Sequence, residues 1–90
     1  MYAIEYTTEA IEDLKRLQRN EPKVYQKAKR LIQELATHPK SGLGHPEALR
    51  GKPEGCWSRE LSRKHRIVYR IFESEVLVLV LSSYGHYDDK

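Results

Sequence analysis

A histidine and a tyrosine stand side by side near the end of the chain, at His86 and Tyr87. They follow an apolar run, residues 76–81, that is typical of a buried strand. Histidine is the side chain best suited to move protons near neutral pH. In a small basic chain, this pair indicates chemistry or recognition on a partner that carries phosphate.

Basic side chains are gathered in two parts of the sequence. One set lies in the helical stretch 15–30, where a solvated helix face is an adequate explanation. The second set lies on two expected strands and the turn between them: Arg59, Arg63, Lys64, Arg66 and Arg70. Arg66 and Arg70 have the same parity along a strand, so their charges converge on one face. This second set is the better candidate for binding an anionic partner.

Length and composition exclude several classes of protein. Ninety residues fit one domain, residues 1–90, and the net charge of +3 permits an anionic partner. Cys56 is the only cysteine, so no intramolecular disulfide forms, and without a visible signal peptide we expect a cytoplasmic protein. The longest apolar run is too short to span a membrane. No metal-ligand spacing and no glycine-rich phosphate loop is present, so we expect neither a metal nor a cofactor.

Two helices are predicted in the first half of the chain, after a short strand over residues 2–6. Thr7 or Thr8 can cap the first helix, in which Ile11, Leu14 and Leu17 predict a buried stripe. The second helix begins near Pro22, because proline suits the first turn, and its apolar residues recur at helical spacing. The two helices are expected to form a hairpin lying on a sheet.

The second half of the chain predicts a β-meander. Residues 40–55 are rich in glycine and proline and leave room for a short strand near residues 47–49. Strands are expected over residues 57–61, 66–72 and 75–82, joined by two tight turns. The fold class is therefore α+β, with two N-terminal helices packed on a twisted antiparallel β-sheet.

Four segments, taken in order, resemble the YoeB/Txe branch of the RelE-like toxins of bacterial toxin–antitoxin pairs. They are HPEALR at residues 45–50, GCWSREL at 55–61, HRIVY at 65–69 and GHY at 85–87. The resemblance implies an endonuclease that cleaves mRNA in the ribosomal A site and is silenced by a cognate antitoxin. It also implies a homodimer as a possible assembly.

The same resemblance implies a role for particular residues. Glu47 matches the general base, Arg66 the arginine that stabilises the phosphate, His86 the general acid and Tyr87 the tyrosine that forms the site or stacks on a base. Contacts with RNA or the ribosome are expected for the basic residues in and beside these motifs: Arg50, Arg59, Arg63, Lys64 and Arg70. Glu60 stands where the family pattern has a second arginine.

The proposed chemistry is sound on general grounds. RNA cleavage without a metal needs a base for the ribose 2′-hydroxyl, a cation for the charged transition state and an acid for the leaving 5′-oxygen. A carboxylate, a guanidinium and an imidazole can fill these roles at neutral pH. Taken singly, each residue has a simpler explanation: Glu47 as a solvated carboxylate, Arg66 as a partner of Glu60 or Glu73, and His86 as a surface histidine.

Two other functions remain open at this level. A non-catalytic toxin of the same fold, which binds the ribosome or gyrase, would use the same elements without the chemistry. A DNA-binding module is the third possibility, but Pro22 and the acidic start of the first helix do not suit a recognition helix.

Overall fold

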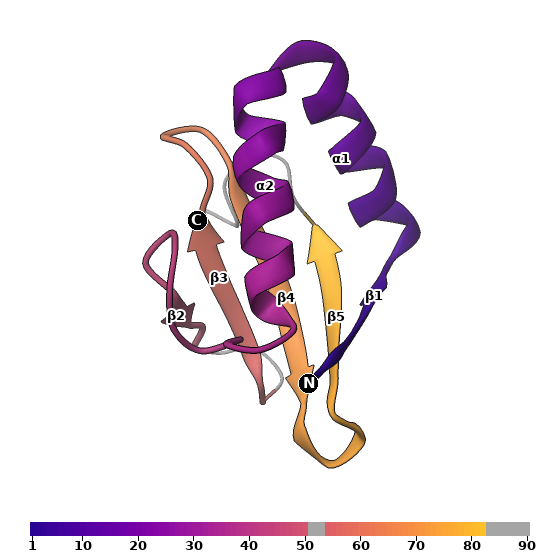
Figure 1. The fold of residues 1–90 in the computed structure, drawn as a ribbon, viewed down its shortest axis with the longest axis vertical. Coiled ribbons are helices and arrows are strands. Elements are labelled where there is room, and N and C mark those ends of the chain that lie inside the picture. The colour runs from indigo at the N-terminus through magenta and orange to yellow at the C-terminus, as the bar shows by residue number, and fades with distance from the viewer. Residues whose placement is uncertain (51–53, 83–90) are drawn as a thin grey trace.

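The computed structural model describes residues 1–50 and 54–82 and contains one five-stranded mixed sheet. Strand β1 spans Ala3–Tyr6, β2 Glu47–Ala48, β3 Cys56–Glu60, β4 Arg66–Phe72 and β5 Leu77–Ser82, and the strand order is β1-β5-β4-β3-β2. A short 3₁₀ helix, Glu73–Glu75, connects β4 to β5. Two helices lie against the sheet, as Figure 1 shows, so the predicted α+β arrangement is confirmed.

The sheet is not antiparallel throughout, contrary to the sequence-based expectation. Strands β2 to β5 form the predicted antiparallel meander, but β1 pairs parallel with β5, with Ala3 opposite Leu77 and Tyr6 opposite Val80. Parallel pairing needs a long crossover connection. Here the connection contains both helices and strands β2 to β4, and it brings β5 back beside β1.

Helix α1 spans Thr8–Asn20 and is fixed to the sheet at its first turn. Of the two predicted capping residues, Thr7 is the N-cap, because its Oγ1 accepts a hydrogen bond from the backbone N–H of Ala10 at 3.0 Å. The same hydroxyl donates to the carbonyl oxygen of Leu81 at 2.8 Å. One side chain therefore sets where α1 begins and joins it to the end of β5.

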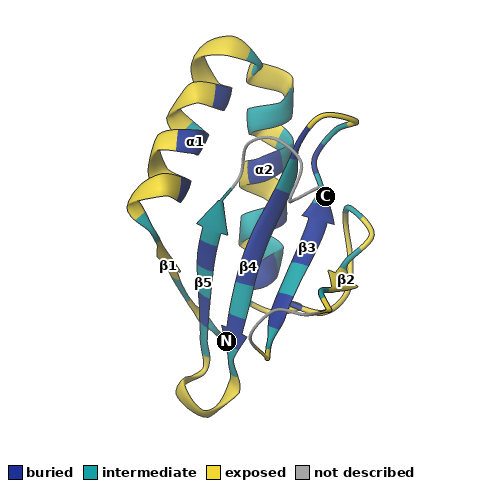
Figure 2. Ribbon diagram, turned by 180° about the vertical axis from the view of Figure 1, so that it is seen from behind, coloured by how far each residue is buried: buried dark blue, intermediate teal, exposed yellow. Residues whose placement is uncertain are grey.

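Helix α2 spans Pro22–Leu35, with the predicted proline in its first turn. The core lies between the helices and one face of the sheet. Its fully buried members alternate along β4, as predicted for Ile67, Tyr69 and Ile71. Figure 2 shows β4 at the centre of the sheet with most of its length in dark blue, because Val68 on the opposite face is buried as well.

The odd-numbered residues of β4 thus face the helices, and Arg66, Val68 and Arg70 face the other way. This second face of the sheet carries the candidate site. In the described part of the chain, no helix has both the length and the apolar character needed to cross a membrane.

Candidate active site

Glu47 is placed by an edge strand and by the tight loop before it. In β2, Glu47 lies opposite Ser58 of β3. The preceding loop is pressed against β3 at Gly44, whose carbonyl oxygen accepts from the Glu60 N–H at 2.6 Å. Gly44 has φ +79°, and a Cβ there would lie 2.6 Å from the Glu60 carbonyl oxygen, so no other residue fits. The backbone of this loop therefore fixes the point from which the Glu47 carboxylate projects.

Arg66 begins β4 and lies next to Glu47 across the sheet. Its Nη1 donates to Ser58 Oγ at 3.2 Å and lies 4.0 Å from Glu47 Oε1. The side chain of Glu47 is 67% exposed and that of Arg66 is 28% exposed. Three neighbouring strands thus bring a carboxylate, a hydroxyl and a guanidinium together on the face away from the helices. Arg66 pairs with neither Glu60 nor Glu73, the two partners that its simpler explanation required.

Ser58 is a member of this group that sequence reasoning missed. It is 1% exposed, and its hydroxyl accepts the hydrogen bond from Arg66 that orients the guanidinium. Strand parity could have identified it, since Trp57 and Arg59 face the helices and Ser58 must then face the opposite way.

The expectation that Arg59 contacts RNA is wrong, because the side chain is fully buried on the helix side of the sheet. Its Nη1 donates to Glu34 Oε1 at 2.7 Å, and its Nε donates to the hydroxyl of Tyr69 at 3.0 Å. The remaining donors bind three backbone carbonyl oxygens of the loop after α2: His38, Ser41 and Leu43. Arg59 is therefore a structural residue that holds this loop against the sheet.

Two further hydrogen bonds join the partners of Arg59 to the loop after α2. The hydroxyl of Tyr69 donates to the carbonyl oxygen of Pro39 at 2.7 Å. The backbone N–H of Leu43 donates to Glu34 Oε1 at 2.8 Å, and this bond, together with Arg59, lowers the pKa of Glu34. A charged carboxylate and a charged guanidinium thus stay paired beneath the loop that leads to Glu47.

The other predicted RNA-binding residues are at the surface. Arg63 and Lys64 are exposed in the turn between β3 and β4, and Arg50 is exposed after β2. Arg70 lies on the same face as Arg66, where its Nε donates to the carbonyl oxygen of Glu54 at 3.1 Å. These positions are compatible with a basic surface beside the Glu47–Arg66 pair. The predictions for His86 and Tyr87 lie outside the described residues.

His65 has a larger structural role than its position in a turn suggested. It is 2% exposed, and its Nε2 lies 2.6 Å from Glu21 Oε2, at the start of α2. The hydrogen bond with His65 lowers the pKa of Glu21. Because Arg66 is the next residue, this contact helps to fix the start of β4 relative to the helices.

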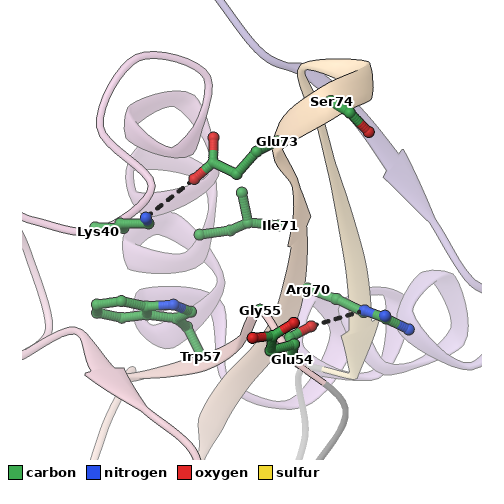
Figure 3. Close-up of a pocket in the computed structure, with 8 residues that line it drawn as sticks. All are labelled: Lys40, Glu54, Gly55, Trp57, Arg70, Ile71, Glu73 and Ser74. Atoms are coloured by element: carbon green, nitrogen blue, oxygen red, sulfur yellow. Dashed lines mark hydrogen bonds and ion pairs between the residues drawn. The ribbon is translucent and has the colours of Figure 1, made fainter.

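A separate hollow of about 550 Å³ lies at the far end of β3 and β4 (Figure 3). Lys40 and Arg70 line it, but so do Glu54 and Glu73, and Lys40 Nζ forms an ion pair with Glu73 at 3.0 Å. In Figure 3, the Trp57 ring and Lys40 lie on one side of β4, and Arg70 lies on the other. With two acidic and two basic side chains, this hollow offers no excess charge to attract a phosphate.

Comparison with known proteins shows the kind of molecule that carries this site. Residues 6–87 match the family model of a "YoeB-like toxin of bacterial type II toxin-antitoxin system". Toxin YoeB of Streptomyces coelicolor is 37% identical over 84 residues, which cover 93% of this chain and 98% of the relative.

Solved structures agree with the sequence match. A YoeB/ParE toxin from Agrobacterium tumefaciens superposes with a TM-score of 0.86 at 33% identity, covering 94% of this chain and 99% of that one. The toxin of a YoeB–YefM complex from Staphylococcus aureus superposes with a TM-score of 0.80 at 28% identity, covering 97% and 99%. A YoeB dimer from the same species gives a TM-score of 0.82 at 29% identity, covering 96% and 98%.

Fold and sequence together define a toxin of a bacterial type II toxin–antitoxin system. Within that class, the chain belongs to the YoeB toxin family.

Proposed function

We propose that this toxin is a ribosome-dependent endoribonuclease that cuts mRNA in the ribosomal A site and so stops translation. One observation carries the proposal: Glu47 Oε1 lies 4.0 Å from Arg66 Nη1 on the sheet face away from the helices, and the reaction needs both a carboxylate base and a phosphate-binding cation. Toxins of the YoeB and RelE families are known as RNases, which supports the same reading.

The reaction needs no more than side-chain chemistry. Glu47 takes the proton from a ribose 2′-hydroxyl, and the 2′-oxygen attacks the adjacent phosphorus. Arg66 stabilises the added negative charge on the phosphate oxygens, because its planar fork can pair two of them. As the bond from phosphorus to the 5′-oxygen breaks, His86 donates a proton to that oxygen. The products are a 2′,3′-cyclic phosphate and a 5′-hydroxyl, and the step requires no metal ion.

The orientation of Arg66 suits this role. Ser58 holds one of its nitrogens at 3.2 Å, and the exposed Glu47 carboxylate approaches only to 4.0 Å. Within the described residues, the rest of the guanidinium stays available for a phosphate. Tyr87 is proposed to stack on an mRNA base beside the cut.

The surrounding basic residues are proposed to bind RNA through its phosphates. Arg70 continues the face of Arg66, and Arg63 and Lys64 extend it around the turn. Arg50 adds a further exposed cation after β2. Binding to ribosomal RNA or mRNA should therefore weaken steeply as salt is added.

The partners proposed are a cognate antitoxin, the ribosome and its mRNA, in the cytoplasm. The S. aureus complex pairs YoeB with YefM, and the S. aureus YoeB dimer makes self-association of this chain a further candidate.

Mapping mRNA 5′-ends in cells after induction tests the proposal. The parent should produce discrete breaks inside codons, and Glu47→Gln and His86→Gln should lose them while both proteins remain folded by circular dichroism. Glu75→Gln, an exposed glutamate in the turn before β5, is the matched control and should cut like the parent. Intact mRNA in cells whose translation has stopped would instead favour a non-catalytic toxin of the same fold.

A further inference from the structure

Glu60 is a carboxylate beside the candidate site that the proposed chemistry does not use. It is the last residue of β3, where it lies opposite Arg66 of β4. It has the same parity as Ser58, so it faces away from the helices, toward the viewer in Figure 2. Because the family pattern has an arginine at this position, a negative charge here replaces a positive one next to the proposed phosphate site.

The backbone holds Glu60 and Arg66 close together. The Glu60 N–H donates to the Gly44 carbonyl oxygen at 2.6 Å, on the β2 side of the strand. Glu60 and Arg66 are therefore a non-hydrogen-bonded pair of the antiparallel ladder, the kind in which facing side chains stand closest. The Arg66 guanidinium nevertheless contacts Ser58 and Glu47. Among the described residues, no hydrogen bond or ion pair occupies the partly exposed Glu60 carboxylate.

The charges on this face determine what Glu60 can bind. Two carboxylates, Glu47 and Glu60, stand beside the one guanidinium of Arg66. A second carboxylate repels an RNA phosphate unless the RNA also brings it a hydrogen-bond donor. The proposed reaction assigns the 2′-hydroxyl at the cut to Glu47. Donors that lie side by side, so that they match both oxygens of a carboxylate, are found on the edges of the bases.

Cations on either side of Glu60 direct an RNA strand across it. Arg66 is proposed to bind the phosphate at the cut. Arg63 and Lys64 are exposed in the turn that directly follows Glu60. A strand that binds one phosphate at Arg66 and the next at the turn passes over Glu60 between them. The nucleotide that joins these two phosphates can therefore turn its base edge toward the free carboxylate.

Guanine is the base whose edge fits a carboxylate. Its Watson–Crick edge presents N1–H and N2–H side by side, one for each oxygen. Adenine and cytosine present one N–H beside a ring nitrogen acceptor, and uracil presents one N–H between two carbonyl oxygens, so each sets an acceptor against the carboxylate. We propose that Glu60 selects guanine next to the cut by accepting hydrogen bonds from N1–H and N2–H. The proposal rests on the proposed nuclease function and adds a base preference to it.

Single-turnover cleavage on programmed ribosomes tests the proposal, with A-site codons that differ only in the nucleotide before or after the cut. The parent should cut codons with guanine at one of these positions about 10-fold faster, or more, than codons with any other base there. Inosine lacks the N2 amino group of guanine and forms only one of the two hydrogen bonds. Replacing that guanine by inosine should therefore remove most of the advantage.

Glu60→Gln keeps the size of the side chain and changes its donors and acceptors. An amide offers one acceptor and one donor group, which suits adenine better than guanine. This variant should therefore cut adenine codons at least as fast as guanine codons. Glu75→Gln is the matched control, because it removes an exposed carboxylate in the turn before β5, and it should keep the parent's preference for guanine.

The outcomes separate this proposal from the proposed function. If Glu60→Gln keeps the parent's base preference, or cuts all codons faster by the same factor, Glu60 recognises no base and the proposal is overturned, while the nuclease function stands. Equal cleavage of guanine and inosine codons by the parent overturns it as well, and this comparison stays decisive if Glu60→Gln fails to fold. If the parent leaves mRNA intact, the proposed function and this proposal both fail.

Discussion

Arg59 and Arg66 lie on adjacent strands of one hairpin, yet their surroundings differ completely. Arg59 is fully buried, and its donors bind Glu34, Tyr69 and three backbone carbonyl oxygens. Arg66 is partly exposed, with one hydrogen bond to Ser58 and a loose contact with Glu47 among the described residues. The protein itself uses the hydrogen-bonding capacity of Arg59, whereas the described residues use only part of that of Arg66.

The difference follows from which face of the sheet each strand position occupies. Arg59 alternates with Ser58 and Glu60 and so faces the helices, where an unpaired charge would be costly. Arg66 faces away from the helices, where water and a ligand can compete for its donors. The same residue type therefore stabilises the loop before Glu47 in one place and forms the candidate site in the other.

Replacing Arg59 should cause the largest loss of stability. Arg59→Met removes the fully buried guanidinium that joins Glu34, Tyr69 and three loop carbonyl oxygens, and breaking such an ionic cluster costs about 3–5 kcal/mol. The free energy of unfolding, measured by urea denaturation, should fall by that amount. Arg66→Met is the matched control and should change it by about 1 kcal/mol or less, because only one hydrogen bond, to Ser58, is lost. Equal losses in both variants would remove the distinction between the two arginines.

Loss of the Glu34 charge should have a smaller effect that depends on pH. The pKa of Glu34 is lowered in the folded state by the Leu43 N–H and by Arg59. Its contribution to stability is therefore complete above the ordinary glutamate pKa and is lost as the pH falls through the lowered folded value. Glu34→Gln should cost roughly 1 kcal/mol at pH 7.

Urea denaturation of parent and Glu34→Gln between pH 7 and pH 3 checks this sign. The two unfolding free energies should differ at pH 7 and converge at the acid end. A difference that grows as the pH falls would contradict the assignment of Glu34 as the charged partner in the Arg59 cluster.

The exposed ion pair between Lys40 and Glu73 should contribute least. Both side chains are 56% exposed and lie 3.0 Å apart, and water and salt screen exposed pairs strongly. Glu73→Gln should therefore lower the free energy of unfolding less than either change in the Arg59 cluster, and added salt should remove the difference. If the loss of unfolding free energy persisted in high salt, the exposed Lys40–Glu73 pair would behave like the buried Arg59 cluster, and the contrast between them would fail.

Local patterns predicted much of the fold. The alternation of Ile67, Tyr69 and Ile71 gave both the limits and the buried face of β4. Pro22 marked the start of α2, and the short strand at Glu47 was present in the glycine-rich region. These features depend on residues close together in the sequence, which is why the sequence alone was sufficient.

Features that depend on distant contacts were not predicted. The parallel pairing of β1 joins residues more than seventy positions apart, and a four-residue strand carries no signal for its direction. Arg59 was assigned to the surface because of its charge, although its parity with Trp57 places it inside. The site was predicted only in part: Glu47 and Arg66 were recognised from motifs, and strand parity gives the face of Ser58, but its position between Glu47 and Arg66 follows only from the pairing of three strands.

The measurement that tests the central claim most directly is the single-turnover cleavage of mRNA on programmed ribosomes by the parent and by Arg66→Ala. We predict that the parent cuts within the A-site codon. Arg66→Ala should cut about 10²–10³-fold more slowly, as when one preorganised donor to a transition state is removed, and should unfold at the parent's urea concentration. An unchanged cleavage rate in Arg66→Ala, or intact mRNA with the parent, would contradict the account.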